Sequence, residues 1–195
     1  MRELSDELAA KVRVGAVVFA EHGYDGTTIE MFSRATAIPT STLYYNFAGK
    51  QEILAFLMQD WLNRTSRVVA EAIESSESAA VRLAGVIEAQ LTAMATDPIT
   101  CQVLLAELGR LGRLPHIADA VQEAFHRPVA KLLAEGVADG SIADVSIENT
   151  TAVIYGAVTL TGLHHVVASN GDIPAFDAST VGADVARIIM NGLSP

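Results

Sequence analysis

Hydroxyl, phenol and amide side chains are concentrated in one short stretch of this sequence, Thr40 to Phe47 (TSTLYYNF). If the stretch forms a two-turn helix, Leu43 and Phe47 share one face, which is buried. The polar residues then point largely outward; they are Thr40, Ser41, Thr42, Tyr44, Tyr45 and Asn46. Such side chains can donate hydrogen bonds to phosphate oxygens and can approach the edges of nucleotide bases.

A second short helix and a tight turn precede this stretch. The sequence TTIE, residues 27–30, fits a capping box in which Thr27 accepts a hydrogen bond from the third helical residue and Glu30 reaches back. Pro39 ends that helix, because a proline disfavours helical geometry at the residue before it. Two short helices joined in this way are typical of a helix-turn-helix, here over about Thr28 to Phe47, whose second helix enters the major groove of duplex DNA.

The rest of the sequence has the composition of a helical protein. Hydrophobic residues make up 50% of the chain, and Gly and Pro interrupt long stretches rich in Ala, Leu, Val and Glu. We therefore predict an all-α fold of about nine helices. Beside the two helices of the motif, the expected ranges are Ser5–Gly23, Lys50 to about Ala72, Ser78–Ala95, Pro98–Leu111, Pro115–Ala138, Ser146–Ser169 and Asp177–Leu193.

The formal net charge of −10 argues against a DNA partner at first sight, because neutralised phosphates usually supply much of the affinity. Residues 1–65 hold 6 Lys and Arg against 8 Asp and Glu, whereas residues 66–195 hold 7 against 15. Most of the acidity therefore lies beyond the helix-turn-helix, although its surroundings are not basic. We expect modest non-specific affinity for DNA and a shallow dependence on salt.

A set of residues in and around the motif resembles the N-terminal domain of the TetR family of transcriptional regulators. Its members are Phe19, Gly23, Tyr24, Thr28, Leu43, Tyr44, Tyr45, Phe47, Lys50 and Leu54. The resemblance covers about the first 60 residues, and the remainder is similar only in the lengths and order of its helices. Departures occur at Phe32 and Ser33, where the family usually has an Ile-Ala pair, at Ala37, where Gly is common, and at Pro39, where a hydroxyl cap is common.

The resemblance implies a three-helix DNA-binding domain over residues 1–50 and a helical effector-binding and dimerisation domain over residues 51–195. One group of residues would contact phosphates and set the register on DNA; it consists of Thr28, Tyr44, Tyr45 and Lys50. A second group would read base edges; it consists of Thr40, Ser41, Thr42 and Asn46. In the alternative interpretation the two tyrosines only pack against the domain, although adjacent helical residues cannot both face a core.

As a member of this family, the protein would be a repressor that a small, largely apolar ligand releases from a roughly palindromic operator. It would form a homodimer through its last two long helices. Small residues permit close approach of helices, and residues 181–190 offer a matching apolar stripe; the small residues are Gly156, Ala157, Thr161 and Gly162. Candidate pocket residues, with ordinary core packing as the alternative for each, are Trp61, Met94, Phe125 and Tyr155.

The sequence indicates no enzyme, cofactor or metal. It contains no nucleophile motif, phosphate-binding glycine loop or paired catalytic carboxylates. Its histidines lack a pair four residues apart and a completing ligand; those considered are His116, His126, His164 and His165. The single Cys101 is expected to be a small buried residue. The remaining alternative is a helical ligand-binding or adaptor protein whose helix-turn-helix no longer binds DNA.

The segment Ala152–Ala168 is almost continuously apolar and close to the length that spans a membrane. It has no flanking Lys or Arg and it contains His164 and His165, so we predict a helix buried in a protein interface and no membrane partner. The lone cysteine and an N-terminus with Asp6 and Glu7, where a signal peptide would be basic and apolar, predict a cytoplasmic protein.

Overall fold

The computed structural model describes residues 4–111, 114–169 and 172–194. These residues form helices and no β-strand, which confirms the all-α prediction. The chain divides into two compact units, Met1–Trp61 with Ile99–Ala118 and Leu62–Pro98 with Asp119–Pro195. The division falls within one long helix, α5 (Lys50–Ile73), so each unit contains part of it.

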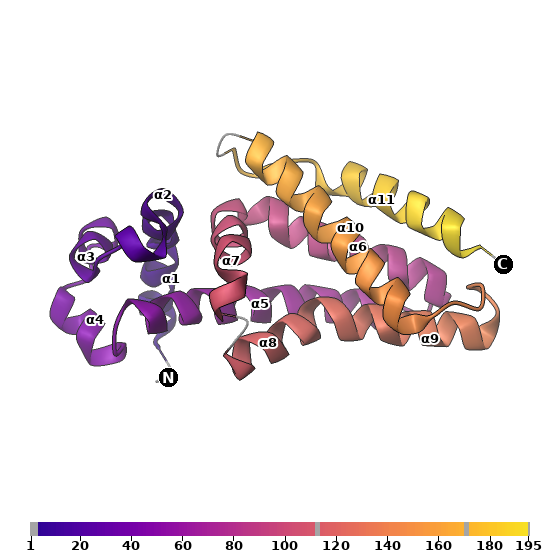
Figure 1. Ribbon diagram of the computed structural model, residues 1–195, viewed down its shortest axis with the longest axis horizontal. Helices are drawn as coiled ribbons and strands as arrows, with labels where there is room; N and C mark the ends of the chain where they lie inside the picture. The colour runs from indigo at the N-terminus through magenta and orange to yellow at the C-terminus, as the bar shows by residue number, and fades with distance from the viewer. Residues whose placement is uncertain (1–3, 112–113, 170–171, 195) are drawn as a thin grey trace. The chain divides into compact units, whose positions relative to one another are not determined.

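The first unit contains the helices of the predicted motif (Figure 1). They are α1 (Asp6–Val14), α2 (Ala16–Gly26), α3 (Ile29–Thr36) and α4 (Thr40–Asn46), joined by the beginning of α5, most of α7 (Pro98–Leu111) and the start of α8 (Pro115–Val121). Helix α1 contacts α2 and α3, and α3 also contacts α2 and α4. Their shared core is aromatic, since the buried rings of Phe19 and Phe32 lie 6.0 Å apart between centroids.

The expected single helix from Ser5 to Gly23 is divided in two at Gly15, so this prediction was wrong in part. Ser5 caps α1 as predicted, because its Oγ accepts a hydrogen bond from the amide of Leu8. Gly15 separates α1 from α2, and a side chain at this position would overlap the ring of Phe32. The regular part of α2 ends at Gly23, which has a φ of 65° that favours glycine.

The N-cap of α3 is Thr28, one residue later than the capping box predicted. The hydroxyl of Thr28 accepts a hydrogen bond from the amide of Met31 at 3.2 Å. Thr27 is buried instead, and its hydroxyl donates to the carbonyl oxygens of Gly23 at 2.7 Å and Val18 at 3.2 Å. Thr27 therefore ties α3 to the end of α2, which a local capping pattern could not reveal.

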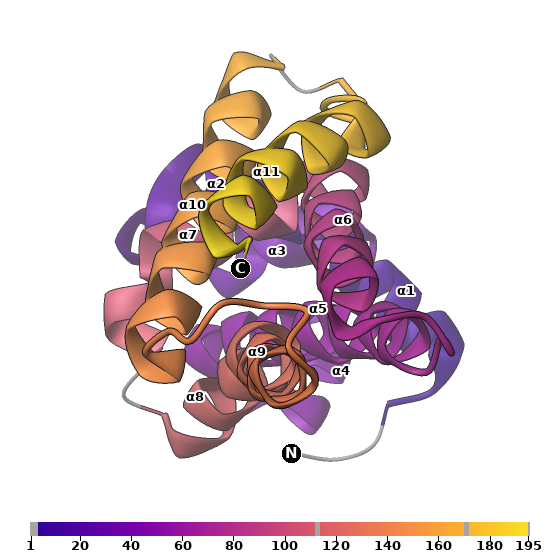
Figure 2. The same cartoon turned by 90° about the vertical axis from the view of Figure 1, so that its right-hand side faces the viewer.

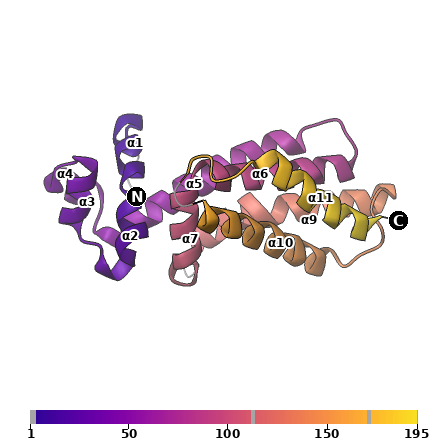
Figure 3. The same ribbon diagram turned by 90° about the horizontal axis from the view of Figure 1, so that it is seen from above.

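The second unit is a helical bundle built around α6 (Ala79–Thr96). Helix α6 contacts α9 (Arg127–Asp139), α10 (Ile147–Ala168) and α11 (Ala178–Leu193). Figures 2 and 3 show these four helices from two directions. Its buried side chains supply much of the core; they include Leu83, Val86, Ile87, Leu91 and Met94. The helices expected over residues 78–95, 98–111, 146–169 and 177–193 all occur, and their ends agree within a residue.

The helix expected over residues 115–138 occurs with a π-helical turn, Gln122–His126, between α8 and α9. Pro128, at the start of α9, has no N–H to donate to the carbonyl oxygen of Ala124. The buried side chain of Gln90 replaces that donor, because its Nε2 donates to the carbonyl oxygens of Ala124 at 3.0 Å and Phe125 at 3.4 Å. The proline thus explains the widened turn, and Gln90 donates to two buried carbonyl groups of that turn.

We expect Gln90→Leu to lower the free energy of unfolding by about 1–3 kcal/mol, because it leaves buried carbonyl groups without a donor. Urea denaturation monitored by circular dichroism measures this loss. Gln102→Leu, on an exposed position of α7, is the matched control and should change stability by less than about 0.5 kcal/mol. Equal stability of the two variants would contradict the role of Gln90.

Candidate nucleic-acid interface

Helix α4 is anchored by two buried side chains and presents polar ones outward. Leu43 is 1% exposed and Phe47, directly after the helix, is 2% exposed. Tyr44 is 58% exposed and Tyr45 is 71% exposed, so neither is a core residue. Ser41 is exposed as well, whereas Thr40, Thr42 and Asn46 are half-buried. The outward polar face expected from the sequence is therefore present, and the tyrosines on it are not packing residues.

The turn between α3 and α4 is held by side-chain hydrogen bonds. Ala37 adopts a left-handed conformation with φ 56° and ψ 21°, which is costly for a residue other than glycine. The hydroxyl of Ser33 donates to the carbonyl oxygen of Ile38 at 2.6 Å, and the amide of Ile38 donates to the hydroxyl of Thr36 at 3.3 Å. Pro39 then directly precedes α4. Ser33 and Thr36 thus offset the absence of a glycine at position 37.

The N-terminus of α3 carries Thr28, which is exposed on the surface of the first unit. Because its hydroxyl oxygen accepts a bond from Met31, its O–H group keeps a donor for another acceptor. The same short helix carries Arg34, an exposed cation near its C-terminal end. Our sequence-based set omitted Arg34, although its charge and its place within the motif were visible in the sequence.

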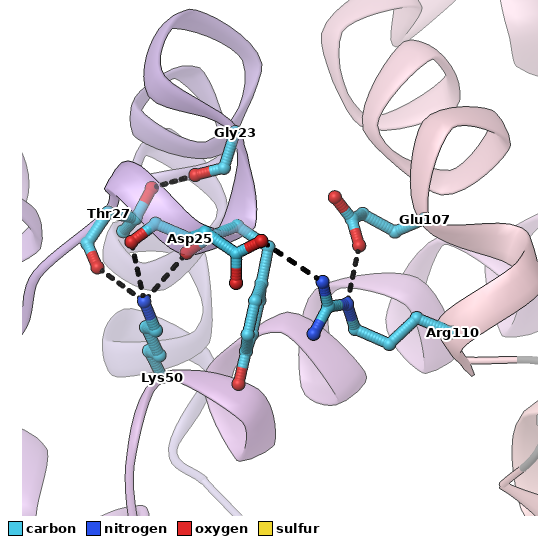
Figure 4. A network of polar contacts seen from close by, with 7 residues as sticks. Gly23, Asp25, Thr27, Lys50, Glu107 and Arg110 are labelled. Carbon is cyan, nitrogen blue, oxygen red and sulfur yellow. Dashed lines mark hydrogen bonds and ion pairs between the residues drawn. The ribbon is translucent and has the colours of Figure 1, made fainter.

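Lys50, at the start of α5, does not present its ammonium group in the way that we expected from the sequence. Its Nζ donates to the carbonyl oxygens of Tyr24 at 2.7 Å, Thr27 at 2.9 Å and Asp25 at 3.1 Å (Figure 4). The same Nζ lies 4.7 Å from the centroid of the Tyr24 ring. In this structure Lys50 therefore contacts the segment that joins α2 to α3.

Arg110 of α7 contacts the same segment (Figure 4). Its guanidinium carbon lies 4.2 Å from the centroid of the Tyr24 ring, and its Nη2 lies 3.4 Å from a carboxylate oxygen of Asp25. A second ion pair, 3.0 Å long, joins its Nε to Glu107. Arg110 is 85 residues from Asp25 in the sequence, so no local pattern could have indicated this contact.

Of the candidate pocket residues, Met94, Phe125 and Tyr155 belong to the second unit. Met94 and Phe125 are buried and Tyr155 is half-buried. The rings of Phe125 and Tyr155 are 5.8 Å apart between centroids, and the His126 ring is 4.3 Å from that of Tyr155. Burial in this cluster lowers the pKa of His126. Trp61 is buried in the first unit.

Titratable groups form no metal site in the part of the chain that the structure describes, since no three His, Cys, Asp or Glu side chains are grouped to hold an ion. Cys101 is buried, as expected for a small apolar side chain. His164 and His165 lie next to each other, with ring centroids 5.3 Å apart, and His165 also lies 5.1 Å from Phe176.

One face of α10 is apolar and exposed. Val153, Leu160 and Val167 follow each other at seven-residue steps and are 68%, 67% and 61% exposed. By length and composition α10 could cross a membrane. An 18-residue stretch of this helix has a mean hydropathy of 1.3, and 28% of that stretch is buried inside the protein. Core helices of globular proteins pass the same test.

The sequence matches known regulators in the region of the helix-turn-helix. The profile of the family described as "Bacterial regulatory proteins, tetR family" matches residues 12–56. The HTH-type transcriptional repressor KstR2 of Mycolicibacterium smegmatis is 25% identical over 138 residues, which are 70% of this chain and 66% of that protein. These matches support the TetR family of transcriptional regulators, to which the resemblance pointed. The proteins that it matches are transcriptional regulators and not enzymes, in agreement with what the resemblance implied.

Solved structures of TetR-family proteins share the whole fold. The ketosteroid transcriptional regulator KstR2 of Mycobacterium tuberculosis has a TM-score of 0.79 at 19% identity, covering 99% of this chain and 97% of the other. The transcriptional regulator FadR of Bacillus subtilis, solved in complex with stearoyl-CoA, has a TM-score of 0.80 at 19% identity, covering 96% and 100%. The likeness therefore extends over both units, well beyond the residues that carried the sequence resemblance.

Proposed function

We propose that this TetR-family regulator is a cytoplasmic, homodimeric repressor that a small, largely apolar ligand releases from a roughly palindromic operator. The observation that carries this proposal is the face of α4, where Tyr44 and Tyr45 are exposed on a helix anchored by Leu43 and Phe47. An outward polar and aromatic face on the second helix of a helix-turn-helix is suited to the major groove.

The contacts with DNA divide by chemistry. Thr28, Tyr44 and Tyr45 can donate to phosphate oxygens, and these contacts position the protein without reading sequence. Thr40, Ser41, Thr42 and Asn46 are short enough to reach base edges from α4. The amide of Asn46 donates to the carbonyl oxygen of Thr42 at 2.9 Å, and its second N–H and its oxygen remain for an adenine. The ammonium group of Lys50 is instead bound to carbonyl groups of Tyr24, Asp25 and Thr27.

We expect Tyr44→Phe and Asn46→Ala to weaken DNA binding in different ways. The first removes a phosphate donor, so it should weaken binding by a similar factor, about fivefold, on every duplex. The second removes a base contact, so it should cost about 1–3 kcal/mol on the preferred duplex and relax the preference at one base pair. Mobility-shift titrations on a panel of single-base variants of the operator measure both. A Tyr44→Phe effect confined to one base pair would contradict the assignment.

Homodimer formation is supported by α10 and α11. Val153, Leu160 and Val167 form an exposed apolar stripe on α10, and Ile188 of α11 is 65% exposed. A β-carbon at Gly156 would have no atom within 4 Å, so that position leaves room for another helix. Two copies of this helix pair can form a four-helix interface across a two-fold axis, which requires a two-fold operator.

The ligand is expected to bind in the second unit. Thr151 and Thr159 lie four residues before and after Tyr155 on one face of α10, and the buried hydroxyls of both find no hydrogen-bond partner among the described residues. A buried hydroxyl without a partner costs free energy, which a polar ligand atom can recover. The Bacillus subtilis relative was solved with stearoyl-CoA, whose long acyl chain and thioester fit an apolar site with a few polar groups.

A selection experiment tests this proposal directly. The full-length protein is mixed with a pool of random duplexes, and the bound sequences are recovered and compared. We expect an inverted repeat, and we expect stearoyl-CoA or a related acyl thioester to release the selected duplex by a coupling free energy of about 1–3 kcal/mol. Absence of any selected sequence would instead favour a ligand-binding or adaptor protein whose helix-turn-helix has lost DNA binding.

A further inference from the structure

The ammonium group of Lys50 is fully used by the protein itself. An ammonium group has three N–H donors, and each has a main-chain carbonyl partner, from Tyr24, Asp25 and Thr27. To contact a phosphate, Lys50 would have to give up at least one of these bonds. These carbonyl groups belong to the end of α2 and the residues that follow it, where a helix concentrates partial negative charge that favours a cation.

We propose that Lys50 is a positioning residue for DNA binding: together with Arg110 it clamps Tyr24 and fixes the segment that joins α2 to α3. This inference rests on the proposed function, and it names a role for Lys50 other than contact with phosphate. Thr27, one of the three carbonyl partners, directly precedes Thr28, the N-cap of α3. Lys50 therefore controls where the phosphate-facing amides of α3 lie.

Tyr24 is the centre of the clamp. Its ring contacts the Lys50 ammonium at 4.7 Å and the Arg110 guanidinium at 4.2 Å, and each distance is within the range of a cation–π interaction. The ring of Phe19 is nearly parallel to that of Tyr24, with centroids 6.5 Å apart, which connects the clamp to the aromatic core. Two like charges at one ring are tolerated because Asp25 and Glu107 pair with Arg110.

Arg110 makes the clamp a contact between α7 and the DNA-binding helices. The guanidinium reaches Asp25 and Tyr24 on one side while its Nε remains paired with Glu107 of its own helix. A substitution at Arg110 therefore changes DNA binding only through the position of the segment that follows α2. This separates Arg110 from residues that touch DNA, whose loss also changes the number of neutralised phosphates.

The test uses one duplex, selected from the random pool by the wild-type protein, and fluorescence anisotropy between 50 and 200 mM salt. We expect Lys50→Met and Arg110→Gln each to raise the dissociation constant about tenfold, or about 1.4 kcal/mol, with an unchanged slope of log K against log salt. Arg110→Lys keeps a cation beside Tyr24 and Asp25 and should recover most of the affinity. Lys131→Met and Arg127→Gln remove the same charges from exposed positions of α9 and should leave affinity and slope unchanged.

A slope that falls by about 0.9 in Lys50→Met would reveal one lost phosphate contact and overturn the inference. Wild-type affinity in Arg110→Gln would overturn the clamp at Tyr24. If Lys50→Met does not fold, as circular dichroism will show, the comparison of Arg110→Gln with Arg110→Lys decides alone. Failure of the wild-type protein to select any duplex would overturn the proposed function itself. If instead the wild-type protein binds a duplex and the variants bind it equally well, only the clamp is overturned.

Discussion

Leu160→Glu is expected to convert the proposed dimer to a monomer and to weaken binding to the selected duplex by about 100-fold or more. Leu160 is 67% exposed at the centre of the apolar stripe on α10, between Val153 and Val167. In a two-fold interface each substitution occurs twice, so two carboxylates would be buried without a partner. One uncompensated buried charge, which costs about 3 kcal/mol, already raises the dissociation constant of the dimer more than 100-fold.

The effect on DNA follows from the dimer. Two linked recognition helices bind two half-sites with an effective concentration that raises affinity by about 10²–10⁴ over one helix, and a monomer loses this gain. Sedimentation velocity measures the association state, and anisotropy with the selected duplex measures the binding. Val68→Glu, which places the same charge on an exposed apolar position of α5, is the matched control and should remain dimeric. A dimeric Leu160→Glu variant would show that α10 is not the interface.

Gly15→Ala is expected to lower the free energy of unfolding by about 2–3 kcal/mol. A β-carbon at this position would overlap the ring of Phe32, which is 1% exposed and cannot move into solvent. Overfilling a close-packed core forces side chains off their preferred rotamers or shifts the backbone. Because Phe32 belongs to α3, we also expect the variant to bind the selected duplex less tightly. Urea denaturation at constant protein concentration measures the loss of stability.

A second substitution makes this prediction specific. Phe32→Leu removes the overlapping ring atoms, so Gly15→Ala should cost at least about 1 kcal/mol less in the Phe32→Leu background than in the wild type. Gly109→Ala is the control, because a β-carbon there would meet no atom within 4 Å and alanine favours the helix. Additive effects of Gly15→Ala and Phe32→Leu would exclude the steric explanation.

The Gly15 contact also accounts for one departure from the family pattern. Phe32 stands where an isoleucine is usual, and its larger ring fills the space that the missing side chain of Gly15 leaves. The departures at Ser33 and Ala37 are related in a similar way. The Ser33 hydroxyl donates to the carbonyl oxygen of Ile38 and so stabilises the turn in which Ala37 replaces a glycine. Both departures are explained by neighbours that the sequence alone does not place beside them.

The sequence by itself determined the all-α fold and the helix-turn-helix, because these depend on local periodicity and on residue types at fixed spacing. The family was indicated by a resemblance within about the first 60 residues. Leu43 and Phe47 are buried, and Tyr44 and Tyr45 are exposed, as a helix from Thr40 requires. The same local reasoning placed the ends of most helices. It failed at Gly15, where one helix ends, the next begins, and the ring of Phe32 packs from a third helix.

Only the tertiary structure decided which partners the polar side chains have. Thr27 is a buried donor to α2 and not a cap, and Gln90 satisfies carbonyl groups 34 and 35 residues away. Lys50 is the clearest case, because a lysine near DNA-binding helices suggests a phosphate contact until its Nζ is found among three carbonyl oxygens. Residue type sets what a side chain can bind, but packing between distant segments decides which acceptor is within reach.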